Sequence, residues 1–167
     1  IAYRDNLEKS ISEVDNIDEL KEKLTAEKKQ AEAELQKLSA QLSEARKKAA
    51  LSLQEKILYE LKDLNFKDAD MVIDFRQADQ YSATGTDIVE FMITTNRGEA
   101  LKPLAKVASG GEMSRIMLAF KKIVGDYDHI PTMIFDEIDT GISGITASIV
   151  GKKMCQIAQS HKIICIT

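Results

Sequence analysis

Apolar residues in the first 64 positions recur at the spacing of an α-helix, and this stretch contains neither glycine nor proline. Both features favour uninterrupted helix. A heptad seam with alternating steps of four and three is formed by Ala31, Leu35, Leu38, Leu42, Ala45 and Ala49. Asp15 and Asn16, followed by Glu19, could cap a new helix, so the pattern also allows a break there. A helix with such a stripe needs a partner helix, and residues 1–64 are therefore predicted to form a coiled-coil arm.

Residues 65–167 show a different pattern, in which short apolar runs alternate with segments of helical spacing. Strands are predicted at 71–75, 87–95, 131–135 and 162–167, and helices at 114–124 and 145–158. The polar stretch 77–86 is predicted to be a hairpin loop, and Asn96-Arg97-Gly98 to be a turn. Strands that alternate with helices predict an α/β domain with a parallel sheet. The sequence stops inside an apolar run, which predicts that this domain is truncated at its C-terminus.

Composition narrows the function only slightly. The 167 residues include 23 basic and 27 acidic side chains, a net charge of -4, which gives no overall basic field for nucleic acid. The one tight basic cluster, Arg46-Lys47-Lys48, is interpreted as a solvated face, and DNA contact there is a hypothesis. No apolar run approaches the length of a membrane span, so no membrane partner is expected. Cys155 and Cys165 are too few for a disulfide framework, are expected in the core, and suit a reducing cytoplasm.

The first motif with chemical meaning is Ser109-Gly110-Gly111-Glu112, which follows Ala108 and opens a predicted helix. Two glycines allow close approach of a ligand to free N–H groups at a helix N-terminus, where the helix dipole favours an anion. This arrangement is typical of a phosphate site. The alternative is a purely structural capping box, with Ser109 as N-cap and Glu112 as its partner.

The second motif is the apolar run Thr132-Met133-Ile134-Phe135 followed by Asp136-Glu137. Open α/β sheets bind their ligands at the C-terminal ends of strands, which is where these carboxylates would lie. One carboxylate can hold Mg²⁺, and the next can activate a water for attack on a phosphate. The alternative is that both acids cap the next helix. None of the eight glycines fits the G-x-x-x-x-G-K-[ST] phosphate loop, so the lysine-bearing half of such a site is missing.

Together, these motifs resemble the ABC-type ATPase heads of the SMC family, and within it the RecN branch of bacterial DNA-repair ATPases. The matching residues lie at 91–99, 101–104, 106–115, 132–144 and 161–167. The resemblance implies the C-terminal lobe of a P-loop ATPase head, residues 65–167, carrying the returning helix of a coiled-coil arm, residues 1–64. The resemblance is strong over about the last hundred residues, whereas the arm is similar mainly in its general helical character.

The resemblance also implies roles for individual residues. Ser109, Gly110, Gly111 and Glu112 would form the signature motif, which contacts ATP held by the second head of a homodimer. Asp136 would be the Walker B ligand of Mg²⁺, and Glu137 the catalytic base. Asp139, Thr140 and Gly141 would form the D-loop at the dimer interface.

The N-terminal half of the same protein would supply the Walker A loop and the outgoing helix. ATP would drive dimerisation, and hydrolysis would drive release, during DNA double-strand-break repair at the nucleoid. The chain alone is expected to be inactive as an ATPase.

Two other functions stay open. The chain could belong to another SMC-like ATPase, such as a Rad50-type repair protein or a condensin-type SMC. It could also be a coiled-coil interaction module without catalysis, although such a module would not need both motifs.

Overall fold

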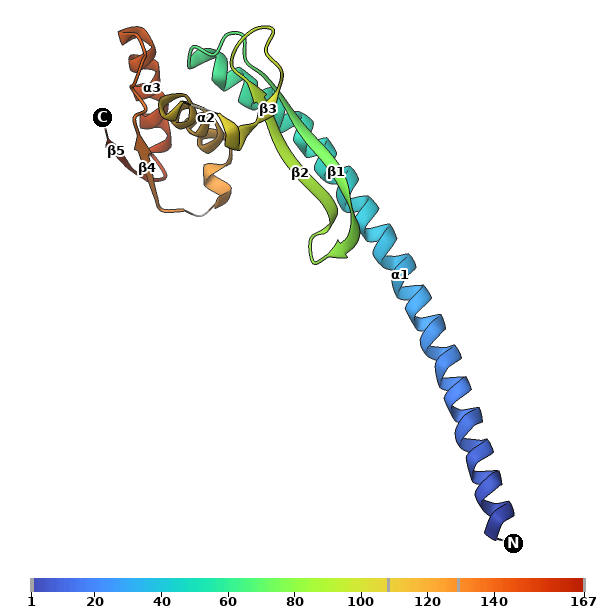
Figure 1. Ribbon diagram of the computed structural model, residues 1–167. Coiled ribbons are helices and arrows are strands. Elements are labelled where there is room, and N and C mark those ends of the chain that lie inside the picture. The colour runs from blue at the N-terminus through green and yellow to red at the C-terminus, as the bar shows by residue number, and fades with distance from the viewer. Residues whose placement is uncertain (1, 108, 129, 167) are drawn as a thin grey trace. The chain divides into compact units, whose positions relative to one another are not determined.

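The computed structural model describes residues 2–107, 109–128 and 130–166, with only the backbone described at 2–3, 5–15, 126 and 128. Ala108 and Thr167 therefore lie outside the described residues. The chain divides into two compact units, residues 1–45 and 46–167. The elements of each unit are labelled in Figure 1.

Helix α1 (Ala2–Asp63) continues for 62 residues without the break that Asp15-Asn16 would allow. It ends where Asn65 adopts a left-handed conformation, with φ 71°. The Phe66 N–H then donates to the Leu61 carbonyl at 3.0 Å, and the Asn65 N–H to the Lys62 carbonyl at 3.3 Å. These two bonds form a Schellman motif, which satisfies carbonyls at the helix end. In the first unit, the seam residues Leu35, Leu38 and Leu42 are exposed.

Strands β1 (Asp70–Ser82) and β2 (Gly85–Thr94) form an antiparallel hairpin, and β3 (Lys102–Pro103) pairs with β2 on its other side. The prediction that residues 77–86 form a loop is wrong, because the two strands continue to a turn at residues 83 and 84. Polar side chains do not interrupt the ribbon, since its backbone groups can pair while its side chains stay in water. At the turn, Gly85 has φ 90°, and the Ser82 hydroxyl donates to the Gly85 carbonyl at 2.7 Å.

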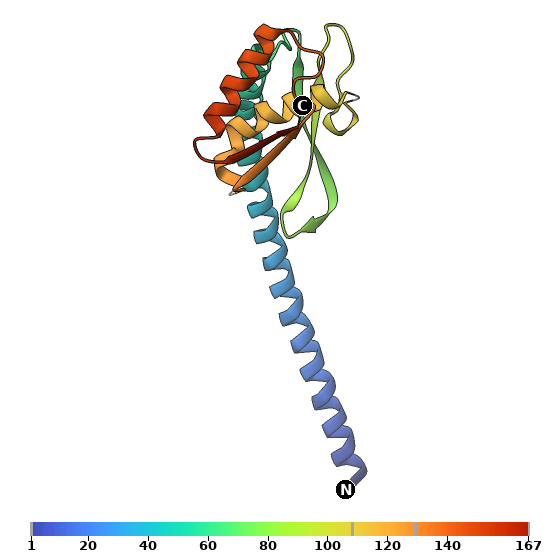
Figure 2. The same cartoon turned by 90° about the vertical axis from the view of Figure 1, so that its left-hand side faces the viewer.

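The remaining elements alternate as predicted: α2 (Gly110–Asp128), β4 (Thr132–Asp136), α3 (Gly144–Ile157) and β5 (Lys162–Ile166). Strands β4 and β5 pair in parallel, with Thr132 opposite Lys162 and Asp136 opposite Ile166. Figure 2 shows these two strands beside α2 and α3. The mixed α/β class predicted from the sequence is confirmed, with the single-turn 3₁₀ helix η1 (Leu104–Lys106) preceding α2.

One core holds the second unit together. It combines the last turns of α1 with the hairpin, α2, α3 and β4, through Ile57, Leu61, Leu64, Phe66, Met71, Ile73, Ile93, Ile116, Leu118, Ala119, Phe120, Met133, Phe135, Ile138, Val150 and Ile157. The expectation that Cys155 and Cys165 lie in the core is wrong, because both are exposed. Cys155 is on the face of α3 opposite its buried residues Thr146, Val150, Lys153 and Ile157.

A cluster of four charged side chains, of which Glu60 and Lys153 are buried, lies at the end of α1. Lys153 from α3 hydrogen-bonds Glu60 and Asp63, the latter at 2.9 Å, and Lys122 from α2 contacts both carboxylate oxygens of Glu60 at 2.7 and 2.9 Å. Burial alone would lower the pKa of Lys153, but the bonds and charges of these carboxylates outweigh it and raise that pKa. The cluster therefore joins three helices through paired charges.

Candidate functional site

The first turn of α2 is built by the signature residues predicted from the sequence. Ser109 is the N-cap: the Met113 N–H donates to its carbonyl at 2.9 Å, and the Glu112 N–H donates to its hydroxyl oxygen at 3.4 Å. Ser109 and Gly110 are exposed, whereas Gly111 is buried. The structural capping role of Ser109 is thus present, and it leaves the exposed backbone of Gly110 at the positive end of the helix dipole.

The two glycines of this turn are packed against the loop that follows β4. A Cβ atom on Gly110 would lie 2.6 Å from Glu137 Oε2. A Cβ on Gly111 would lie 2.9 Å from the Glu137 carbonyl oxygen and 3.2 Å from both the Thr140 Cβ and the Thr140 carbonyl oxygen. Only glycine lets the helix come so near to the loop backbone. The two motifs predicted separately from the sequence therefore meet in space.

The carboxylates of the second motif are exposed at the C-terminal end of β4. Glu137 has φ 52°, a left-handed conformation that is uncommon for a residue other than glycine. Its N–H donates to the Ile166 carbonyl of β5 at 3.1 Å. The Ser114 hydroxyl, one turn into α2, donates to the Asp136 carbonyl at 2.5 Å. The Ser114 side chain thus ties the start of α2 to the end of β4 through the Asp136 backbone carbonyl, and Asp136 itself is exposed to solvent.

Asp139, Thr140 and Gly141 form the turn after Glu137. The Thr140 N–H donates to the Glu137 carbonyl at 3.1 Å, and Gly141 has φ 72°. Arg115 Nη1 donates to the Thr140 carbonyl at 2.9 Å, so α2 also holds this turn. The loop ends at Ser143, whose side chain accepts from the Thr146 N–H and caps α3. All three groups of predicted site residues are thereby gathered around the start of α2.

Sequence reasoning assigned no role to Ser114 and Arg115, although both bind the loop. A signal was present for Arg115, since it stands at helical spacing before Leu118 and Ala119, on a buried apolar face of α2. A charged side chain on a buried helix face requires a polar partner.

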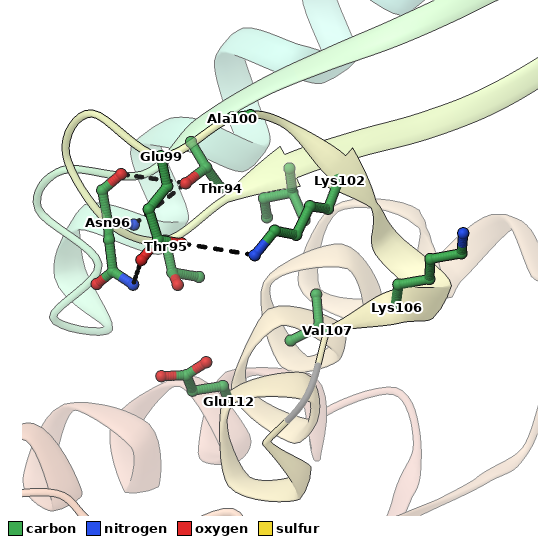
Figure 3. Close-up of a pocket in the computed structure, with 10 residues that line it drawn as sticks. Thr94, Thr95, Asn96, Glu99, Ala100, Lys102, Lys106, Val107 and Glu112 are labelled. Carbon is green, nitrogen blue, oxygen red and sulfur yellow. Dashed lines mark hydrogen bonds and ion pairs between the residues drawn. The ribbon is translucent and has the colours of Figure 1, made fainter.

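A small polar cavity of about 160 Å³ lies beside the first turn of α2. Figure 3 shows its lining, in which Asn96 and Lys102 both approach Glu99 and the Glu112 side chain projects from the helix below them. Asn96 Nδ2 donates to Glu99 Oε1 at 3.0 Å, and Lys102 Nζ lies 3.9 Å from Glu99 Oε2. The predicted turn at Asn96-Arg97-Gly98 is confirmed, with φ 82° at Gly98.

Curated DNA-repair proteins are similar to this chain over most of its length. The RecN protein of Haemophilus influenzae is 39% identical over 150 residues, which cover 89% of this chain and 27% of that protein. RecN of Halalkalibacterium halodurans is 35% identical and RecN of Bacillus subtilis 34% identical, and each alignment covers 100% of this chain. The chain is RecN-like and of the SMC family. The resemblance predicted from the motifs is confirmed.

This RecN-like chain spans only 27 to 32% of the length of those relatives. No family model matches it. Within the described residues, no helix is long and apolar enough to span a membrane.

Solved SMC heads share the fold of this RecN-like chain. The Smc head domain with an extended coiled coil from Pyrococcus furiosus, bound to the C-terminal domain of ScpA, matches with a TM-score of 0.50 at 19% identity. That match covers 74% of this chain and 29% of the solved one. The Smc head of Pyrococcus yayanosii, with a coiled coil and joint, gives the same TM-score and identity over 22% of its own length. The predicted fold class, that of an ABC-type SMC head, is thereby confirmed.

Proposed function

We propose that this chain is the C-terminal half of an SMC-like DNA-repair ATPase. Residues 65–167 form the C-terminal lobe of the head, and residues 1–64 form the returning helix of its arm. The observation that carries the proposal is the meeting of Gly110, Gly111 and Ser114 with the loop that bears Asp136 and Glu137. A turn that merely caps a helix does not need an approach so close that the loop backbone leaves no room for a Cβ atom, as at Gly111.

Each site residue then has a chemical role. The exposed start of α2, with the Ser109 hydroxyl, suits the γ-phosphate of ATP carried by a second head, because helix N-termini bind anions. Asp136 supplies a carboxylate for Mg²⁺, a cation that prefers a few carboxylates together with phosphate oxygens. Bound Mg²⁺ would neutralise charge on the phosphates. Glu137 accepts the proton of the attacking water, and residues 139–141 face the partner head.

The described residues fit these groups in two respects. The Asp136 carboxylate is exposed while its carbonyl is held by Ser114, so the side chain is available to a cation. The space beside Gly110, where a Cβ atom would lie, is approached only by the flexible carboxylate of Glu137. The described residues contain no group of three or more His, Cys, Asp or Glu side chains suited to a metal.

One face of the β4–β5 pair supports a missing N-terminal half as partner. Three isoleucines on this face are at least half exposed: Ile134 at 64%, Ile164 at 50% and Ile166 at 52%. Ile134 and Ile164 are directly opposed in the parallel register, and Ile166 follows on the same face. Apolar patches of this kind mark interaction sites, and the N-terminal half, with its Walker A loop and outgoing helix, would cover this one.

The wider function follows from the relatives named as DNA-repair proteins. ATP would join two heads and hydrolysis would part them, during double-strand-break repair at the nucleoid in the cytoplasm. DNA contact at Arg46-Lys47-Lys48 stays a hypothesis, since Arg46 Nη1 already pairs with Asp87 Oδ2 at 2.9 Å.

The deciding experiment is Glu137→Gln in the complete protein. We expect hydrolysis to fall by about 10²-fold or more, as for loss of a general base, and ATP to trap a dimer in size-exclusion chromatography. Glu90→Gln, on the hairpin, is the matched control and should behave as the unaltered protein.

A Glu137→Gln protein that stays monomeric with ATP would remove the assigned role of Glu137. A complete protein without any ATPase activity would favour the non-catalytic interaction module. The isolated chain should show no turnover.

A further inference from the structure

Arg115 is a buried cation in the middle of the proposed site. It lies in the second turn of α2 and is only 7% exposed. Its Nη1 donates to the Thr140 carbonyl at 2.9 Å, and its guanidinium carbon lies 5.4 Å from the centre of the Phe66 ring. Phe66 is the residue that closes the Schellman motif at the end of α1. One side chain therefore contacts the end of α1 and the turn at residues 139–141.

Burying Arg115 at this position costs folding free energy, so a contribution to stability does not explain its presence. Among the described residues, Arg115 Nε is buried and has no hydrogen-bond partner. Burial lowers the pKa of Arg115, and the charge of Glu112 offsets this only in part. An arginine remains charged in proteins, so the desolvation is not relieved by loss of a proton. A methionine would fill similar volume without this penalty, because replacing buried charges by apolar groups is often neutral or stabilising.

The acceptor of Arg115 explains what the cation does at this position. Thr140 belongs to a turn with a left-handed residue on each side, Glu137 at φ 52° and Gly141 at φ 72°. Glycine adopts this conformation freely, but at Glu137 it persists only where the surroundings enforce it. Arg115 donates its hydrogen bond to Thr140, the middle residue of the turn at 139–141. Ser114 binds the Asp136 carbonyl, just before this turn in the chain. Phe66 supports the guanidinium by a cation–π contact.

We propose that Arg115 is a positioning residue that holds the turn at residues 139–141 against the first turn of α2, with the Phe66 ring as its platform. The claim that Arg115 holds this turn in place, the mechanical part of the proposal, rests only on the contacts described above. Its consequence for hydrolysis rests on the proposed function, in which that turn faces the second head. Arg115 touches neither nucleotide nor water in this role.

Hydrogen exchange on the complete protein tests the mechanical part. Arg115→Met should raise amide exchange in residues 138–143 by about tenfold, the effect of losing one charge-assisted hydrogen bond. Arg115→Lys should restore part of the protection, and Phe66→Leu should raise exchange there less than Arg115→Met. Arg76→Met, on the hairpin, is the matched control and should leave the segment unchanged.

Steady-state kinetics test the consequence. Arg115→Met should lower kcat for ATP by about tenfold with KM changed less than twofold, because ATP first binds to the other half of the head. Arg115→Lys should recover part of kcat. Unchanged exchange in residues 138–143, or increased exchange throughout the lobe, would overturn the positioning role. A complete protein with no ATPase activity would refute the proposed function, while the exchange result would still decide the role of Arg115.

Discussion

Residues 16–45 and residues 46–63 belong to one helix, α1, but their apolar side chains have different surroundings. In the first stretch Leu20, Leu24, Leu35 and Leu38 are exposed, although they recur at helical spacing. In the second stretch Ile57 and Leu61 are completely buried in the core of the second unit. The same amphipathic pattern thus produces a core where other elements cover it, and an uncovered stripe where none of the described residues does. Periodicity defines the stripe but not its partner.

The largest expected effect is the difference in free energy of unfolding between alanine substitutions at two leucines of this helix. Leu61→Ala should lower the free energy of unfolding by about 2–5 kcal/mol, because Leu61 is 0% exposed and leaves a cavity. Leu38→Ala, at a 55% exposed position, should change it by less than about 0.5 kcal/mol. Urea unfolding followed by circular dichroism measures both. A comparable loss from Leu38→Ala in the complete protein would show that a partner helix covers the seam there.

The next effect concerns the buried charges at the end of α1. Lys153→Met should cost about 3 kcal/mol at neutral pH, the lower end for breaking a buried pair, because Lys122 still pairs with Glu60. The raised pKa of Lys153 means that its stabilisation is complete below the ordinary value of 10.5 and is lost as pH rises through the folded-state pKa. Urea unfolding at several alkaline pH values should therefore show the two proteins converging. A constant difference would contradict the assignment.

A smaller effect separates the two glycines of the signature. Gly111→Ala should destabilise by about 1–3 kcal/mol, since its Cβ would meet the Glu137 and Thr140 backbones. Gly110→Ala should cost less than about 1 kcal/mol, because its Cβ meets only the flexible end of the Glu137 side chain. Thermal melting of the pair provides the measurement. Equal losses would mean that the loop after β4 does not approach α2 as closely as the structure shows.

The smallest effect is expected at the hairpin. Arg46→Ala removes a partly buried pair with Asp87 and should cost about 0.5–1 kcal/mol. Arg76→Ala removes exposed pairs with Asp74 and Glu90, and its cost should stay near the lower end of about 0.2–1 kcal/mol for such pairs. Raising the salt concentration should reduce both losses in urea unfolding, the second more completely. A salt-independent loss would point to packing of the Arg46 stem instead.

Much of the fold was predictable because local patterns decided it. The long helix followed from an absence of glycine and proline, and the order of α2, β4, α3 and β5 followed from alternating periodicities. The hairpin length was not predictable from residues 77–86, because a solvated ribbon needs no apolar alternation. Tyr59 is exposed and Phe66 is buried, because the Schellman motif turns the chain at Asn65 and directs Phe66 inward.

The sequence by itself determined the chemical groups of the candidate site and their order along the chain. Ser109, the paired glycines and Asp136-Glu137 are a distinctive set wherever they lie, because few combinations of residues suit phosphate and a divalent cation. Tertiary structure alone decided that Gly111 touches the backbone of Glu137 and Thr140, and that Arg115 binds the Thr140 carbonyl. Those contacts join residues far apart in sequence, and they depend on how α2 packs against β4, which no local pattern specifies.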